Sequence, residues 1–83
     1  PLAHPLLLAP VALHRTVHAD GEVGVACSAS AQQAGLVLST QASTPLEDVA
    51  RAIRDDADRG PLWMQLYLQH DRGFNTEFVR RVE

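Results

Sequence analysis

Three short apolar runs, spaced about 30 residues apart, constrain the fold of this chain more than any other feature. They occupy residues 6–9, 36–38 and 62–68. Each is too short for a typical helix and has the length of a strand. The first two are continuously apolar, which is expected of strands buried on both faces. Short strands at this spacing, with helix-forming sequence between them, predict βα units that build a parallel α/β sheet.

Helices are predicted after the first and third of these strands. Residues 22–34 are Ala-rich and contain no helix breaker except Gly24, with Asp20 as a candidate N-cap and Gly35 as the closing residue. A last helix begins near a cap at Asn75 or Thr76 and carries the apolar side chains Phe78, Val79 and Val82.

The helix after the second strand has the clearest start signal. Thr44 can cap it, Pro45 suits its first position, and Glu47 completes a capping box. Its apolar residues follow helical spacing and form one stripe, which predicts the face that packs on the sheet: Leu46, Val49, Ala50 and Ile53.

The third strand has two unlike faces. Met64 and Leu66 should pack under the helices, so Gln65 and Tyr67 should point to the opposite face. Because sites in parallel α/β folds gather at the carboxyl ends of strands, the candidate positions are Gln65, Tyr67 and the segments 10–12 and 39–40. A planar ligand with donors and acceptors could satisfy a glutamine amide, but neighbouring backbone could do so equally well. The pattern suits either a doubly wound sheet or part of a barrel.

Composition and charge exclude several classes of function. The net charge is −3 and the chain contains no lysine, so no basic surface for nucleic acid is predicted. The longest apolar stretch, residues 5–13, is far shorter than the roughly 20 residues that span a bilayer. A single cysteine, Cys27, cannot form an internal disulfide and suits a reducing compartment, so the expected location is the cytoplasm.

Other chemistry-bearing residues predict no site of their own. His14 and His18 are four residues apart but have no third ligand fixed in the sequence, so no metal site is expected. Cys27 lies among small residues and is expected to pack rather than to react. Gly21 and Gly24 lack the rest of a phosphate-binding fingerprint. The acidic loop formed by Asp55, Asp56 and Asp58 is expected to be a solvated surface.

The ends of the sequence favour part of a larger fold. The chain begins at Pro1 without an initiator methionine and finishes at Glu83 inside a predicted helix, without a stop signal. Residues 1–83 are therefore expected to form an incomplete domain. Its unpaired sheet edges should associate with the remainder of the fold or with a second copy of the chain.

Four motifs, read in order, resemble one enzyme family. They are Leu8-Ala9-Pro10-Val11-Ala12-Leu13-His14-Arg15, His18-Ala19-Asp20-Gly21-Glu22, Val37-Leu38-Ser39-Thr40, and Trp63-Met64-Gln65-Leu66-Tyr67 followed by Asp71-Arg72. Their order and spacing across nearly the whole chain resemble the FMN-dependent 2-hydroxy-acid dehydrogenases and oxidases, which include glycolate oxidase, lactate oxidase and flavin-type lactate dehydrogenase. The resemblance implies about two and a half units of a (β/α)₈ barrel.

The resemblance also implies roles for individual residues. The backbone at Pro10, Val11 and Ala12 should pass beside the flavin ring of FMN, while Ser39 and Gln65 hydrogen-bond it. Val11 stands where the family usually has threonine, and because that contact is largely through backbone, FMN binding is expected to survive. Met64 replaces the usual aromatic on the helix-facing side.

The implied reaction is oxidation of an (S)-2-hydroxy acid to the 2-oxo acid, with Tyr67 contacting the substrate. The catalytic base, the carboxylate-binding arginines and the lysine near the flavin have no counterparts among these 83 residues. The chain alone is therefore expected to be inactive and to contain no catalytic residue. The alternative from another class is a non-catalytic α/β fragment or interaction module.

Overall fold

The chain forms a three-stranded parallel sheet with helices packed on one face. The computed structural model describes residues 2–83. Its elements follow one another in the order β1 (Leu7–Leu8), the 3₁₀ turn η1 (His14–Thr16), α1 (Gly21–Ala31), β2 (Gly35–Leu38), α2 (Leu46–Ile53), β3 (Leu62–Met64) and α3 (Arg72–Val82). The spatial order of the strands is β1-β2-β3 and both pairings are parallel. The predicted succession of strands and helices is confirmed.

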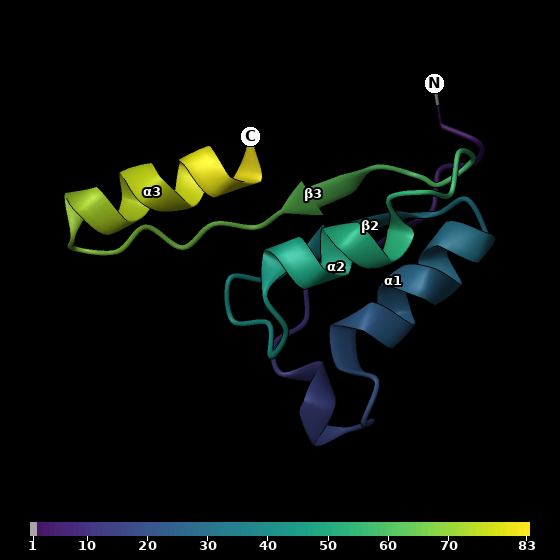
Figure 1. Ribbon diagram of the computed structural model, residues 1–83, viewed down its shortest axis with the longest axis horizontal. Helices are drawn as coiled ribbons and strands as arrows, with labels where there is room; N and C mark the ends of the chain where they lie inside the picture. The colour runs from purple at the N-terminus through teal and green to yellow at the C-terminus, as the bar shows by residue number, and fades with distance from the viewer. Residues whose placement is uncertain (1) are drawn as a thin grey trace.

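The hydrophobic core lies between β2 and the helices α1 and α2. Leu36 and Leu38 point from β2 into this layer, and Figure 1 shows α1 and α2 together against the sheet. Burying one such leucine contributes about 1.5–3 kcal/mol. The other buried members of the core come from the helices and are Ala26, Ala29, Val49 and Ile53. The predicted stripe on α2 is confirmed, with Leu46 and Ala50 half-buried beside it.

The first strand is less buried than its sequence predicts. Leu6, Leu7 and Leu8 are 70%, 38% and 41% exposed. β1 is an edge strand that pairs only with β2, and the sheet face opposite the helices is uncovered within the described residues, where Trp63 is also 55% exposed. Burial on both faces requires protein beyond these elements.

Helix α1 is shorter than predicted and has a different start. It ends at Ala31 rather than Ala34, because Gln33 adopts a left-handed conformation with φ of 57°. Asp20 occupies the N-cap position but makes no side-chain capping bond, since its backbone (φ −74°, ψ −18°) is helical rather than extended.

The capping box predicted for α2 is wrong. Pro45 is the N-cap, with φ of −57° and ψ of 142°, and no side chain caps the helix. The Thr44 hydroxyl instead donates to Glu22 at 2.9 Å. Glu47 binds Arg81 of α3. Tertiary partners thus replace both local interactions on which the box depends.

The third strand is also shorter than predicted, and the last helix starts earlier. β3 ends at Met64 rather than Leu68, because β2 ends at Leu38 and offers no further strand backbone. Asp71 caps α3 by accepting a hydrogen bond from the Phe74 N–H at 3.2 Å. The predicted cap at Asn75 is wrong, because its side chain bonds the backbone of Gln69.

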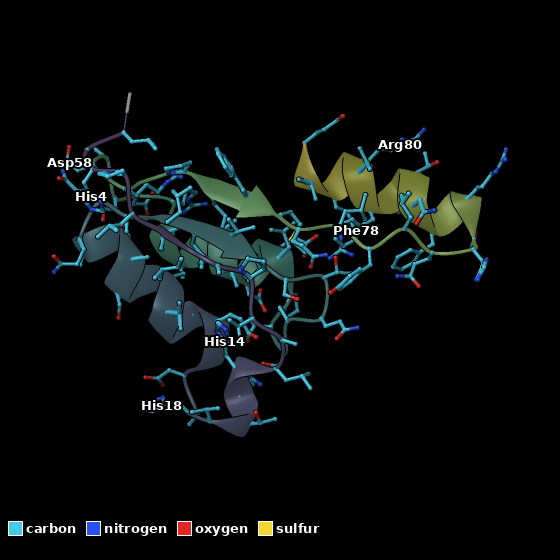
Figure 2. The ribbon with its side chains drawn as sticks, turned by 180° about the vertical axis from the view of Figure 1, so that it is seen from behind. His4, His14, His18, Asp58, Phe78 and Arg80 are labelled. Atoms are coloured by element: carbon cyan, nitrogen blue, oxygen red, sulfur yellow. The ribbon has the colours of Figure 1, made fainter. Side chains whose placement is uncertain are left out.

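Helix α3 lies beyond the end of β3, away from α1 (Figure 1). Phe78 is its one buried residue and points toward the rest of the molecule, whereas Arg80 points outward (Figure 2). Arg81 donates from Nε to Glu47 Oε1 at 2.6 Å and from Nη2 to Oε2 at 2.8 Å. This two-pronged ion pair ties α3 to α2, and the Arg81 hydrogen bond lowers the pKa of Glu47 to about 2.

Replacing Glu47 with glutamine is therefore expected to loosen α3. We expect amide exchange in α3 to become about two- to fivefold faster, as is usual when one exposed ion pair is lost. Hydrogen exchange followed by mass spectrometry measures this. Glu77→Gln is the matched control, because Glu77 pairs with Arg80 inside α3 at 4.0 Å and joins no second element. Equal exchange rates in both variants would contradict the docking role of Glu47.

Candidate functional site

The candidate site lies at the carboxyl edge of the sheet. The segment Pro10, Val11 and Ala12 follows β1, Ser39 follows β2, and Gln65 follows β3. Because the three strands are adjacent and parallel, these segments lie along the same edge. The structure therefore places the residues that the sequence predicts for cofactor binding along one edge of the sheet.

Gln65 is held against the end of β2 by its backbone and its side chain. Its N–H donates to the Leu38 carbonyl at 2.8 Å, and its side-chain oxygen accepts from the Thr40 N–H at 3.2 Å. The backbone donor of Thr40 fixes which end of the amide is the oxygen. The amide nitrogen of Gln65 consequently faces away from Thr40 as a donor for another group.

Thr40 joins the two strands beyond the point where their regular pairing stops. Its hydroxyl donates to the Gln65 carbonyl in a short hydrogen bond and accepts from the Tyr67 N–H at 3.2 Å. The sequence alone predicts only that Thr40 lies where the second strand ends. Its bridging role depends on the register between β2 and β3, which no local pattern contains.

Ser39 and the segment after β1 complete this edge. Ser39 is buried, and its oxygen accepts from the Gln41 N–H at 3.0 Å, so its hydroxyl hydrogen remains free to donate. Val11 and Ala12 are exposed and line a hollow of about 220 Å³. Ser39 lines a different hollow of about 320 Å³. Tyr67 is 56% exposed.

A buried carboxylate that the sequence did not reveal lies behind this edge. Glu22 is 0% exposed and accepts hydrogen bonds from the His14 N–H at 3.1 Å and the Ser43 N–H at 2.8 Å. The hydroxyls of Ser43 and Thr44 donate to its other oxygen at 2.7 and 2.9 Å. We call these four residues the Glu22 cluster.

Hydrogen bonds within the Glu22 cluster keep its carboxylate ionised. Burial opposes ionisation, but the hydrogen bonds from the Ser43 side chain and from backbone N–H groups outweigh it and lower the pKa of Glu22 to about 2. A glutamate in the first turn of a helix ordinarily faces solvent and interacts with the helix dipole. Its sequence position therefore carried no signal of burial.

The histidines do not gather into a metal site. Figure 2 shows His14 and His18 in the turn before α1, and His4 at another end of the molecule near Asp58. The His18 ring accepts from the Asp20 N–H at 3.1 Å, while Nδ1 of His14 is buried without a hydrogen-bond partner. Within residues 2–83, no group of three potential ligands is placed to hold a metal ion.

Two predictions about minor residues need correction. Cys27 is exposed rather than packed, because its face of α1 points away from the sheet. Asp56 is half-buried rather than solvated, and it accepts a short hydrogen bond from Ser30 that lowers its pKa. Asp55 and Asp58 are exposed, as predicted for this loop.

No helix in the described part of the chain has the length and apolar character needed to cross a bilayer.

Comparison with known proteins identifies the family. The model of the family described as "FMN-dependent dehydrogenase" matches residues 1–83. An L-lactate oxidase of Alicycliphilus denitrificans is 47% identical over 83 residues, which are 99% of this chain and 21% of the relative. The 2-hydroxyacid oxidase 2 of Bos taurus is 37% identical over 82 residues, which are 99% of this chain and 22% of the relative. An L-lactate dehydrogenase of Pseudomonas aeruginosa is 43% identical over 82 residues, which are 99% of this chain and 20% of the relative.

The fold agrees with that of a solved flavoprotein. A mandelate oxidase variant, whose structure holds an FMN adduct, superposes with a TM-score of 0.84 at 32% identity, covering 96% of this chain and 24% of that one. The superposition confirms the predicted fold class, parallel βα units from a (β/α)₈ barrel. The chain spans about a fifth of the length of the curated relatives it matches. The chain belongs to the FMN-dependent dehydrogenase family.

Proposed function

We propose that this chain supplies one side of the FMN site in an enzyme that oxidises an (S)-2-hydroxy acid to the 2-oxo acid. The observation that carries the proposal is the shared edge of Pro10–Ala12, Ser39 and Gln65, at which the Gln65 amide nitrogen is left as an outward donor. Family membership and relatives named as lactate and 2-hydroxyacid oxidases support the same reaction.

The chemistry of this edge fits FMN. The pyrimidine half of a flavin ring carries carbonyl and ring-nitrogen acceptors in one plane, and Gln65 and Ser39 each retain a donor. The exposed backbone after β1 leaves the third segment, Pro10, Val11 and Ala12, open to contact with the ring. FMN, when bound, supplies the two-electron acceptor for the reaction.

Tyr67 would hold the substrate. Its phenol is exposed two residues beyond Gln65, and a phenol can donate to the carboxylate or hydroxyl oxygen of a small hydroxy acid. The substrate class comprises acids such as lactate, glycolate and mandelate. The base that removes the substrate proton and the cations that hold its carboxylate would come from the remainder of the barrel.

The exposed sheet face supports association of this chain with the remainder of the barrel. Trp63 and Leu7 are apolar side chains on the face opposite the helices, and the edge of β1 has no strand partner among the described residues. Completing the barrel would bury both features. We place the assembled enzyme in the cytoplasm, on the basis of a single cysteine that forms no disulfide.

FMN titration of the intact protein that carries this chain tests the proposal. We expect FMN to bind with a change in flavin fluorescence, and a 2-hydroxy acid to bleach the flavin absorbance near neutral pH. Folded protein that binds no FMN would overturn the proposal and favour the non-catalytic module instead.

Substituting Gln65 tests the cofactor contact directly. Gln65→Leu removes the proposed donor and the acceptor of the Thr40 N–H, so we expect the Kd for FMN to rise by about 10-fold, or about 1.4 kcal/mol. Gln32→Leu is the control, because Gln32 is exposed just after α1, at the opposite edge of the sheet. An unchanged Kd in Gln65→Leu would exclude this contact.

A further inference from the structure

The Glu22 cluster connects two of the three segments that form the candidate flavin edge. His14 lies two residues after Ala12, in the loop that follows β1. Ser43 and Thr44 lie four and five residues after Ser39, in the loop that follows β2. One carboxylate, buried at the start of α1, therefore bonds both loops at once.

A second set of hydrogen bonds completes the connection between these loops. The Leu13 N–H donates to the Gln41 carbonyl at 3.2 Å, and the Gln41 N–H donates to the Ser39 hydroxyl oxygen at 3.0 Å. Leu13 has a left-handed backbone, with φ of 55° and ψ of 49°, which costs about 1–2 kcal/mol for a residue other than glycine. Such a conformation persists only where its surroundings hold it.

The cluster is built from donors that converge on one carboxylate. All four groups that face Glu22 are donors, two backbone N–H groups and two hydroxyls. A carboxylate accepts at both oxygens and satisfies all four donors at once. Leucine has a similar size but no acceptor, so at this position it would remove the group that joins the loop after β1 to the loop after β2.

We propose that Glu22 is a positioning residue of the flavin site, which holds the Pro10–Ala12 backbone and the Ser39 hydroxyl at the spacing that FMN requires. This inference rests on the proposed function. Glu22 touches no cofactor itself and acts through the loops that it bonds.

The opposite edge of the sheet provides an internal comparison. Near the other end of α1, buried Ser30 donates to Asp56 in the loop between α2 and β3. This pair also joins two elements, but it lies at the amino edge of the strands, away from Pro10–Ala12, Ser39 and Gln65. Variants of Asp56 should therefore lower stability without altering the flavin edge.

The experiment compares Glu22→Leu, the milder Ser43→Ala and the control Asp56→Asn in the intact FMN-containing protein. Each is titrated with FMN at a temperature at which circular dichroism shows that it is folded, and its bound-flavin absorption spectrum is recorded. We expect the Kd for FMN to rise by about 10-fold or more in Glu22→Leu and by less in Ser43→Ala, with an altered flavin spectrum in both. Asp56→Asn should melt at a lower temperature but retain the wild-type Kd and spectrum.

The outcomes separate this inference from the proposed function. If the wild-type protein binds no FMN, the proposed function fails. If the wild-type protein binds FMN and both cluster variants melt early with an unchanged Kd and spectrum, Glu22 is structural only and the inference is overturned. If Glu22→Leu does not fold, Ser43→Ala decides by the same two readouts, since it keeps the charge and both backbone donors. A Kd raised equally in Asp56→Asn would also overturn it.

Discussion

Replacing Glu22 with alanine is expected to lower the free energy of unfolding by about 3–4 kcal/mol, because several buried donors lose their acceptor at once and each unsatisfied group costs about 1–3 kcal/mol. The donors left behind include the backbone N–H groups of His14 and Ser43, both of which donate to Glu22 in the folded chain. Chemical denaturation of the intact protein measures the change. Glu77→Ala is the control, because Glu77 is exposed and forms only a long ion pair within α3.

The Glu22 carboxylate should also make the stability of the folded protein sensitive to acid. The pKa of Glu22 is about 2 in the folded chain against an ordinary value of 4.5, so the folded state binds this proton less readily than the unfolded state. Its stabilising contribution is complete above about pH 4.5 and is lost as the pH falls toward 2. Glu22→Ala should therefore show a shallower loss of stability across this range than the wild-type protein. If the free energy of unfolding fell equally with pH in both proteins, Glu22 would not be ionised in the folded state.

The second large effect is expected at Gly60, just before β3. A Cβ built at this position lies 2.5 Å from the carbonyl carbon and oxygen of Ala34 and 2.7 Å from the nitrogen of Gly35. These are backbone atoms at the start of β2, so the segments that lead into β2 and β3 would have to separate. We expect Gly60→Ala to destabilise the protein by about 2–3 kcal/mol, the usual cost of overpacking a rigid site.

Gly73→Ala is the matched control for Gly60→Ala. Gly73 lies in the first turn of α3, where the nearest atom to a new Cβ is an Asp71 carboxylate oxygen at 3.2 Å. Alanine favours helix over glycine by about 1 kcal/mol, so this variant should be neutral or slightly stabilising. Thermal melts of both variants measure the difference. Similar melting temperatures would show that β2 and β3 separate more easily at this point than their backbone contact suggests.

Elements with strong local patterns could be predicted from the sequence. The apolar run at β2 and the stripe of Val49 and Ile53 on α2 depend on residue spacing, which the chain carries by itself. Ser39 was found because it follows the second apolar run, and Gln65 because it alternates with Met64 and Leu66 in the third run. Their side-chain roles came from resemblance to a family rather than from the pattern.

Features that depend on partners far along the chain could not be predicted in this way. Thr44 and Glu47 have the spacing of a capping box, yet Thr44 bonds Glu22 and Glu47 bonds Arg81. Asn75 is only six residues from Gln69, but the loop before α3 brings its side chain onto the Gln69 backbone, which its sequence position does not predict. In each case the side chain bonds a group that the folded backbone brings near it, rather than the helix end that its position suggests.

The sequence by itself determined the parallel βα order, the approximate places of the three strands and the membership of a family, since these depend on spacing and residue type. Only the tertiary structure decided that Glu22 is buried, that Thr40 bridges β2 and β3, and that Asp56 is bonded by Ser30. The physical reason is that burial and hydrogen bonding of a polar side chain depend on which distant donors the folded backbone brings within about 3 Å, and no local periodicity encodes that approach.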